Sequence, residues 1–556
     1  MHLSDQVVAQ SRKLSILCPM ALVALGAALL GGTVATDSQA EIEAYDRSFD
    51  GYCESVEDFM DCRPTNTGGN RPGTEDILLE WGREQGIEGL DGKIPLSRRR
   101  QALDRVYQLI RKRYLPGAVT AKDAPDAGVK VLVGEPRVVM FAPEGKTADK
   151  AGNIARLGHL GPNFKKEGRW GQYMFPEVNR LKGGWILVRV SVGGDGDRNY
   201  LDYVSGDGGK NWRYFARYEE GAEMPSRDWA ALQLPDGEEI KVAVPQHDPR
   251  NIFGYVKIDV PDKNIKLYGS SYLGRQYYRL GDLPRDLQGV TLLRRKAGEE
   301  GGGWWPEQKW SEDKAYLDPD LLVRDSLPNP LHGLWLHETK ILPDGSLVRA
   351  DFKSLPMISD LRPDGTLGPE PHRVLRSSDR GRTWKVAAEI PGSNFYPFWF
   401  KGLTTATVRV HLLAFPNGNW LAAFRHGGIY WSGGGPLIVR KSSDQGKTWS
   451  EPKAIRMPGV NPSGLVLENG IAVMSYQRPG VFLTFCADGQ GDSWGNDVTL
   501  VKAWRHARNE NSCCNGTFLA TGPDRFLYVY TKWDVPDPWG QPRLAVIAQE
   551  FVVSKK

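Results

Sequence analysis

The sequence Ser442-Ser443-Asp444-Gln445-Gly446-Lys447-Thr448-Trp449 recurs, with small changes, elsewhere in the chain. Residues 377–384 and 205–212 follow the same S-x-D-x-G-x-x-W pattern, and residues 488–494 are a looser copy with one extra residue. Each copy follows a short apolar run. An Asp in such a stretch accepts hydrogen bonds from the amides of a turn, and Gly tolerates a positive φ. The pattern therefore predicts a repeated β-hairpin turn, in which the Trp covers the apolar edge of its hairpin.

A second repeat consists of a tight turn followed by an apolar strand. It occurs at residues 181–190, 342–350, 415–424, 468–476 and 522–530. Alternation of these units with the hairpins is typical of a β-propeller, in which each four-stranded blade relies on its neighbours to cover its faces. We predict an all-β, six-bladed propeller over residues 128–556. Residues 216–335 fit the repeat poorly and are interpreted as one or two blades with long insertions.

The N-terminal residues predict export from the cytoplasm. A basic pair, Arg12 and Lys13, precedes an apolar stretch that ends at small residues, which is typical of a signal peptide over residues 1–40. An uncleaved anchor is the alternative, and membrane contact is expected only through it. We expect a secreted, periplasmic or cell-surface protein. Because such compartments are oxidising, we also predict a disulfide between Cys53 and Cys62, which lie in a loop-rich segment.

Residues 41–127 lack both repeats and are predicted to form a mostly helical or irregular N-terminal extension. Apolar residues recur at helical spacing from Leu103 to Tyr114, which predicts one amphipathic helix. The face opposite these residues is strongly basic. Two interpretations remain open for it: contact with a membrane or an acidic glycan, or a solvated face of a helix that packs on the main domain.

Composition excludes several classes of function. The chain has 556 residues and a formal net charge of only +4, from 71 Lys and Arg against 67 Asp and Glu. No long basic run is present, so nucleic acid is not expected as the main partner. The sequence has no phosphate loop, no dinucleotide fingerprint and no HExxH motif, and its Asp-rich turns are explained by the hairpins. We predict neither a cofactor nor a metal site.

The hairpin repeats, the turn-strand units and the export signal together resemble the sialidase superfamily. Members of that family carry such repeats, called Asp-boxes, on a six-bladed propeller, and the resemblance covers about residues 130–553. It implies an exo-acting glycoside hydrolase of an anionic sugar. In that family three Arg side chains bind the substrate carboxylate, a Glu activates a Tyr nucleophile, and an Asp is the acid/base.

The resemblance assigns candidate site residues by position. Arg425 ends the turn-strand unit that begins at Pro416, and Arg478 ends the next unit. The candidate substrate-binding residues are Arg425, Arg478 and Arg505, and the candidate catalytic residues are Asp195, Asp197 and His426. Alternatively, these arginines lie on the surface or between blades, and the Gly- and Asp-rich loop 193–197 is a plain hairpin tip.

Three departures from the family pattern predict weak or no hydrolysis of standard sialosides. The first blade opens with Met174-Phe175-Pro176 where the family has Arg-Ile-Pro. Arg409 stands near the position of the Glu, and Gly516 near that of the Tyr. We therefore keep two alternatives. One is a polysaccharide lyase that uses His and Arg side chains. The other is a non-catalytic propeller that binds a carbohydrate or a protein through aromatic residues, namely the cluster at residues 395–400 and Trp533 and Trp539.

Overall fold

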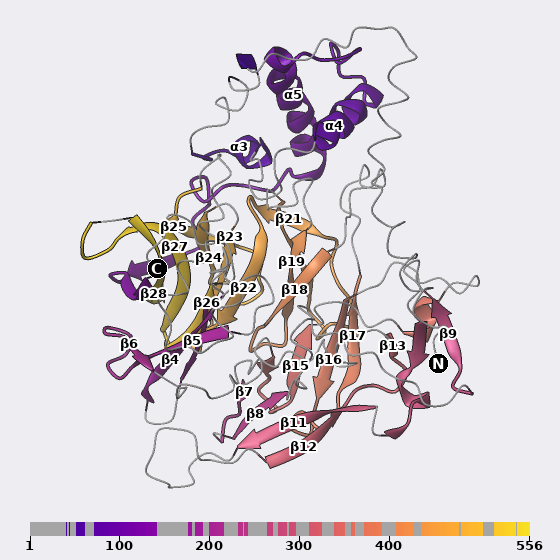
Figure 1. Ribbon diagram of the computed structural model, residues 1–556, viewed down its shortest axis with the longest axis vertical. Helices are drawn as coiled ribbons and strands as arrows, with labels where there is room; N and C mark the ends of the chain where they lie inside the picture. Colours follow the sequence, from indigo (N-terminus) through magenta and orange to yellow (C-terminus); the bar gives the residue numbers. More distant parts are fainter. Residues whose placement is uncertain are drawn as a thin grey trace, which may run out of the picture.

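The computed structural model is a mostly β structure with the helices α3 (Val56–Asp61), α4 (Pro72–Glu84) and α5 (Leu96–Tyr114) on one side (Figure 1). It confirms the prediction of a six-bladed β-propeller. The structure describes residues 40–41, 44, 52–61, 72–141, 176–180, 184–192, 199–215, 232–236, 238–242, 264–270, 276–285, 288–295, 311–324, 339–350, 357–361, 372–391, 407–426, 435–477, 480–503, 516–540 and 542–556.

Six antiparallel sheets form the blades, which we name A to F in chain order. Blade A contains β3 (Pro176–Arg180), β4 (Ile186–Val192), β5 (Asn199–Ser205) and β6 (Arg213–Phe215). Blade B contains β7 (Leu232–Gln233), β8 (Glu239–Val242), β11 (Gly289–Arg295) and β12 (Ser311–Tyr316). Blade C contains β14 (Lys340–Ile341), β15 (Leu347–Ala350), β16 (His372–Ser377) and β17 (Lys385–Ile390). Blade D contains β18 (Thr407–Ala414), β19 (Trp420–His426), β20 (Leu437–Ser442) and β21 (Lys453–Arg456).

The last two blades complete the ring. Blade E contains β22 (Val460–Val466), β23 (Ala472–Gln477), β24 (Val481–Cys486) and β25 (Gly495–Val501). Blade F contains β26 (Thr517–Gly522), β27 (Arg525–Pro536) and β28 (Pro542–Lys555), with β1 (Val129–Val133) and β2 (Arg137–Phe141) from the start of the propeller paired to β28. Residues from both ends of the propeller thus share one sheet, and this pairing closes the ring.

The stretch that fits the repeat poorly is one blade with an insertion. A separate three-stranded sheet of β9 (Leu267–Ser270), β10 (Gln276–Arg279) and β13 (Leu322–Arg324) interrupts blade B between its second and third strands and is completed after its fourth. It lies at the right of Figure 1. The first of the two interpretations of this region is therefore correct.

Each blade packs against both neighbours because successive side chains of a strand point to opposite faces of the sheet. In β19, Trp420 and Phe424 are buried in a cluster shared with blade C. Leu421 and Ala423 alternate with them and are buried in a cluster shared with blade E. The alternation assigns each position of a strand to one of the two junctions between blades.

The repeated hairpin turns join the third and fourth strands of their blades, as predicted. In the copy at residues 442–449, the Ser442 hydroxyl donates to Asp444 (2.7 Å) and accepts from the Gly446 amide (2.7 Å), while Asp444 also accepts from the Thr448 amide (2.9 Å). Hydrogen bonds from Thr448 and Ser442 lower the pKa of Asp444 to about 2. Gly446 has a φ of 89°, which disfavours other residues.

The tryptophans of these turns differ in burial. Trp384 is fully buried and its indole N–H donates to the Gly381 carbonyl (2.9 Å), whereas Trp212 and Trp449 are only half-buried. The fourth copy has Cys486 in the place of the Ser, and its thiol donates to Asp488 (3.0 Å). The turn thus tolerates one more residue and a different donor.

The N-terminal helices pack on blades D and E. They are α3 (Val56–Asp61), α4 (Pro72–Glu84) and α5 (Leu96–Tyr114), and α5 is the predicted amphipathic helix. Its buried face joins one cluster with apolar residues of both blades. Among its basic residues, Arg99 and Arg111 form ion pairs with Asp76 of α4 and Glu57 of α3. This favours the interpretation of the basic face as the outer face of a packed helix.

The predicted disulfide is not formed, because the thiol of Cys53 is free. Cys53 is buried in the cluster between the helices and the blades, and its amide donates to the Ala503 carbonyl (2.9 Å). This hydrogen bond holds the backbone of Cys53 in place while its side chain lies in the core. Cys62 lies outside the described residues, as do residues 1–39 of the predicted signal. Within the described ranges, no helix has the length and apolar character needed to cross a membrane.

Candidate functional site

The ends of the second strands meet at one face of the propeller. The first strands of blades C, D, E, F and A contact one another in turn, and each blade continues outward by antiparallel hairpins. All second strands therefore run in the same direction and end at the same face, which we call the second-strand face. Among them are β4, β19, β23 and β27.

Most of the candidate residues follow the ends of these strands in the sequence. Arg425 and His426 are the last two residues of β19, although their side chains lie outside the described part of the structure. β4 ends three residues before Asp195, and β23 ends one residue before Arg478. Asp195, Asp197, Arg478 and Arg505 themselves lie outside the described residues, as do Met174 and Phe175.

The register shows which positions of blades D and E are equivalent. Their tight turns close in the same way, by hydrogen bonds from Phe415 to Asn419 (2.8 Å) and from Leu467 to Ile471 (2.9 Å). Arg425 and Gln477 are each opposite the first residue of their third strand. The counterpart of Arg425 is therefore Gln477, which is buried, and Arg478 corresponds to His426.

Two arginines are directly opposite each other at the end of blade D. Arg409 in β18 is the cross-strand partner of Arg425 in β19. On its other side Arg425 is opposite Leu437, so neither cross-strand neighbour is acidic. Directly opposite residues have Cβ atoms about 4.5–5.5 Å apart, and like charges in such pairs destabilise a sheet. The side chains of both arginines lie outside the described part of the structure, so the register alone places them opposite each other.

Side chains from two blades converge on one backbone carbonyl of a third blade near the axis. Lys340 of β14 donates to the Gly464 carbonyl of β22 (3.1 Å), and Nε2 of His411 in β18 is 3.0 Å from the same oxygen. Because a carbonyl only accepts, Nε2 of His411 carries a proton. His411 is buried. In this arrangement that nitrogen is not a general base, and the contact links the first strands of blades C, D and E.

The position near the family's Tyr is closed by another tyrosine. A Cβ added to Gly516 would lie 1.8 Å from the hydroxyl oxygen of Tyr528. Tyr528 is fully buried, and desolvation raises the pKa of its hydroxyl well above the ordinary value. A larger side chain at position 516 therefore requires Tyr528 to move, and Tyr528 itself stays protonated at neutral pH.

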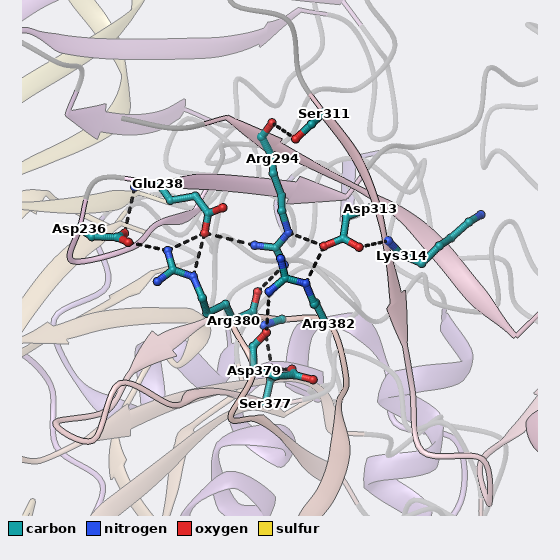
Figure 2. A network of polar contacts seen from close by, with 11 residues as sticks. Asp236, Glu238, Arg294, Ser311, Asp313, Lys314, Ser377, Asp379, Arg380 and Arg382 are labelled. Carbon is teal, nitrogen blue, oxygen red and sulfur yellow. Dashed lines mark hydrogen bonds and ion pairs between the residues drawn. The ribbon is translucent and has the colours of Figure 1, made fainter. Parts of the chain in front are cut away.

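The junction of blades B and C contains an ionic network (Figure 2). It consists of Asp236, Glu238, Asp313, Arg294, Arg380 and Arg382. Arg294, which is 6% exposed, donates to Asp313 (2.6 Å) and pairs with Glu238 (3.3 Å). Arg380 donates to Glu238 (2.6 Å) and to Asp236 (2.7 Å). Acids and arginines are equal in number, so the network joins two blades without excess charge.

A second buried ion pair joins blades D and E and was not foreseen from the sequence. Arg456 at the end of β21 donates to both oxygens of Asp497 in β25 (2.8 and 2.9 Å). The Tyr476 hydroxyl donates to the same carboxylate (2.5 Å), and burial raises the pKa of this tyrosine. Every partner is satisfied, which indicates a structural role.

The described part of the chain contains no cluster of His, Cys, Asp and Glu side chains able to hold a metal ion. No family model and no curated protein matches the chain.

Three solved structures illustrate what the fold is similar to. A Dyadobacter fermentans protein described as of unknown function is 17% identical, with 68% of this chain and 94% of that chain covered and a TM-score of 0.43. A Hadza microbial sialidase is 14% identical over 69% of this chain and 65% of its own length, with a TM-score of 0.37. A Penicillium chrysogenum α-L-arabinanase complexed with arabinobiose is 13% identical over 75% and 98%, with a TM-score of 0.34.

Proposed function

We propose that the protein acts on an anionic glycan that binds at the second-strand face, beside blades D and E. The observation that carries this proposal is the cross-strand pair of Arg409 and Arg425, whose neighbours in the register include no acid. Carboxylate and sulfate groups accept two parallel hydrogen bonds from a guanidinium group. A glycan that bears such a group is therefore the ligand that this end of blade D favours.

Strand alternation supports Arg478 as a second residue that binds the glycan. Arg505 follows the outer strand of the same blade. Position 425 falls on the face of Leu421 and Ala423, which pack toward blade E. Tyr476 packs toward blade D, and a residue two positions further along a strand has the same face. We therefore expect Arg425 and Arg478 to approach the D/E junction from opposite sides.

For catalysis we propose Asp195, Asp197 and His426 as acid/base candidates in an exported, exo-acting glycoside hydrolase. Hydrolysis needs one group to protonate the leaving oxygen and another to activate a nucleophile, which carboxylates do in most glycosidases. Arg409 and Gly516, near the positions of the family's Glu and Tyr, favour a route without a tyrosine nucleophile.

A non-catalytic propeller that binds the same glycan is the second candidate. The lack of space at Gly516 favours it, because a Cβ there would collide with the Tyr528 hydroxyl, near the position where sialidases carry their nucleophile. Binding without turnover would support this candidate. Release of new reducing ends would support the hydrolase, and an unsaturated product would support a lyase.

Isothermal titration of the purified protein with sialylated and uronate-containing oligosaccharides tests the proposal. We expect binding that weakens as salt increases and is lost in Arg425→Ala. The matched control is Arg525→Ala, because Arg525 begins β27 at the opposite face and its guanidinium group is 3.3 Å from Asp524. Undiminished binding in Arg425→Ala would place the site elsewhere.

Export is tested separately by N-terminal sequencing of the exported protein. Exported protein that still begins at Met1 would contradict cleavage of the signal.

A further inference from the structure

The hairpin of β27 and β28 is unusually long and extends beyond its blade at the second-strand face. β27 has 12 residues and β28 has 14, whereas the corresponding β19 and β20 of blade D have 7 and 6. Pairing continues to Val535 opposite Arg543 and Pro536 opposite Pro542. The tip of this hairpin therefore projects from the face at which β4, β19 and β23 end.

Trp539 at the tip is exposed but held in place. Its side chain is 75% exposed, more than any other large apolar residue of the described chain. The Trp539 amide donates to the Asp537 carboxylate (2.9 Å), and the Gly540 amide donates to the Asp537 carbonyl (2.8 Å). Gly540 has a φ of 77°, and Asp537 is buried. The turn thus fixes the backbone that carries the indole ring in water.

We propose that Trp539 is a stacking platform for a sugar ring beyond the anionic sugar, so that the ligand is an oligosaccharide or polysaccharide. This inference rests on the proposed function. An indole ring offers a large flat apolar surface with little conformational entropy to lose, and it packs on the C–H face of a sugar ring. Blade F lies between blades E and A, whose second strands lead to Arg478 and to Asp195. A glycan bound at the strand ends of this face could therefore extend to the tip.

The test compares chain lengths. Wild type, Trp539→Ala and Trp539→Phe are titrated with oligogalacturonates of one and six rings, and with α2,8-linked sialic acid oligomers of one and six units. We expect Trp539→Ala to bind the six-ring ligand about tenfold more weakly and the single ring as well as wild type does. Phe is expected to restore most of the loss. Quenching of indole fluorescence by the long ligand is expected to decrease in Trp539→Ala.

Tyr268→Ala on β9 is the control, because it removes an aromatic residue from the inserted sheet. The outcomes separate the two proposals. If wild type binds no ligand of either series, the proposed function fails and the platform with it. If wild type binds but Trp539→Ala shows the same dependence on chain length, only the platform is wrong. An equal loss of affinity for short and long ligands also overturns the platform. So does a result in which Trp539→Ala changes only the self-association of the protein and leaves glycan affinity unchanged.

Discussion

The B/C network and the end of blade D use arginine in opposite ways. In the B/C network, Arg294 is paired with acids of its own blade at 2.6–3.3 Å, and Arg380 is paired with acids of the neighbouring blade at 2.6–2.7 Å. At the end of blade D, Arg425 is opposite Arg409 and Leu437. The first arrangement is complete within the protein. The second is the arginine pair on which the proposed anion site rests.

This difference shows why a count of arginines does not locate a site. Paired cations stabilise the junction between two blades, whereas like charges opposite each other cost stability unless a ligand compensates. The partners in the register, and not the number of charges, distinguish the two cases.

The largest effect is expected from the core beneath the B/C network. Trp384 is fully buried with Leu347 and Ile240 from the two blades, so Trp384→Ala is expected to lower the free energy of unfolding by roughly 3–5 kcal/mol. Trp449→Ala is expected to cost less, because Trp449 is only half-buried. Chemical denaturation of both variants measures this. Equal losses of stability in the two variants would show that the burial of the Trp does not determine how much each turn contributes.

The B/C network is expected to weaken in acid. Burial acts to raise the pKa of Asp313, but hydrogen bonds from Arg294 and from the Lys314 amide outweigh it and lower the pKa. When the pKa of a carboxyl is lower in the folded state than in the unfolded state, its ionisation stabilises the fold. This stabilisation is fully present above the unfolded-state pKa, near 3.9, and is lost as the pH falls through the folded-state pKa. The deficit of Asp313→Asn, on the order of 1 kcal/mol, should thus be constant above about pH 5 and shrink below about pH 4.

Melting temperatures of wild type and Asp313→Asn from pH 7 to pH 3 provide this measurement. Glu312→Gln is a suitable control, because Glu312 precedes Asp313 in β12 and is exposed. A deficit that stays constant to pH 3 would contradict the role of the ionised Asp313.

The smallest effect concerns the turn with Cys486. Burial and the bond to Asp488 raise the pKa of its thiol to about 12, so it remains a protonated donor. Cys486→Ser keeps a donor and should change stability by less than about 0.5 kcal/mol, whereas Cys486→Ala should cost about 1 kcal/mol. Thermal melts compare the variants. A large loss in Cys486→Ser would show that sulfur packing, and not the hydrogen bond, holds the turn.

The local parts of the fold could be predicted from the sequence, and the contacts between blades could not. The turn at residues 442–449 can be recognised from the sequence because the hydrogen bonds of Asp444 lie within five residues. Arg456 and Asp497 form a buried pair 41 positions apart, with no spacing to reveal it. The pairing of β1 with β28 joins distant parts of the chain, and no local pattern signals that.

The candidate site was predicted less completely than the fold. The position of Arg425 at the end of a second strand follows from the turn-strand unit, and the structure agrees. The repeat suggested that Arg478 was its counterpart, but the register assigns Gln477. One residue changes the face of a strand, and a sequence repeat does not fix the register that closely. The partnership of Arg409 with Arg425 likewise required the pairing of β18 and β19.

The most direct test makes the same substitution on both sides of the comparison. Arg294→Gln and Arg425→Gln are melted side by side without ligand at low salt. Arg294→Gln should be destabilised by roughly 2–4 kcal/mol, because it leaves Glu238 and Asp313 without their partner. Arg425→Gln should be as stable as wild type or up to about 1 kcal/mol more stable, because it removes the repulsion with Arg409. If Arg425→Gln were destabilised as much as Arg294→Gln, Arg425 would be a structural arginine and the end of blade D would not be the anion site.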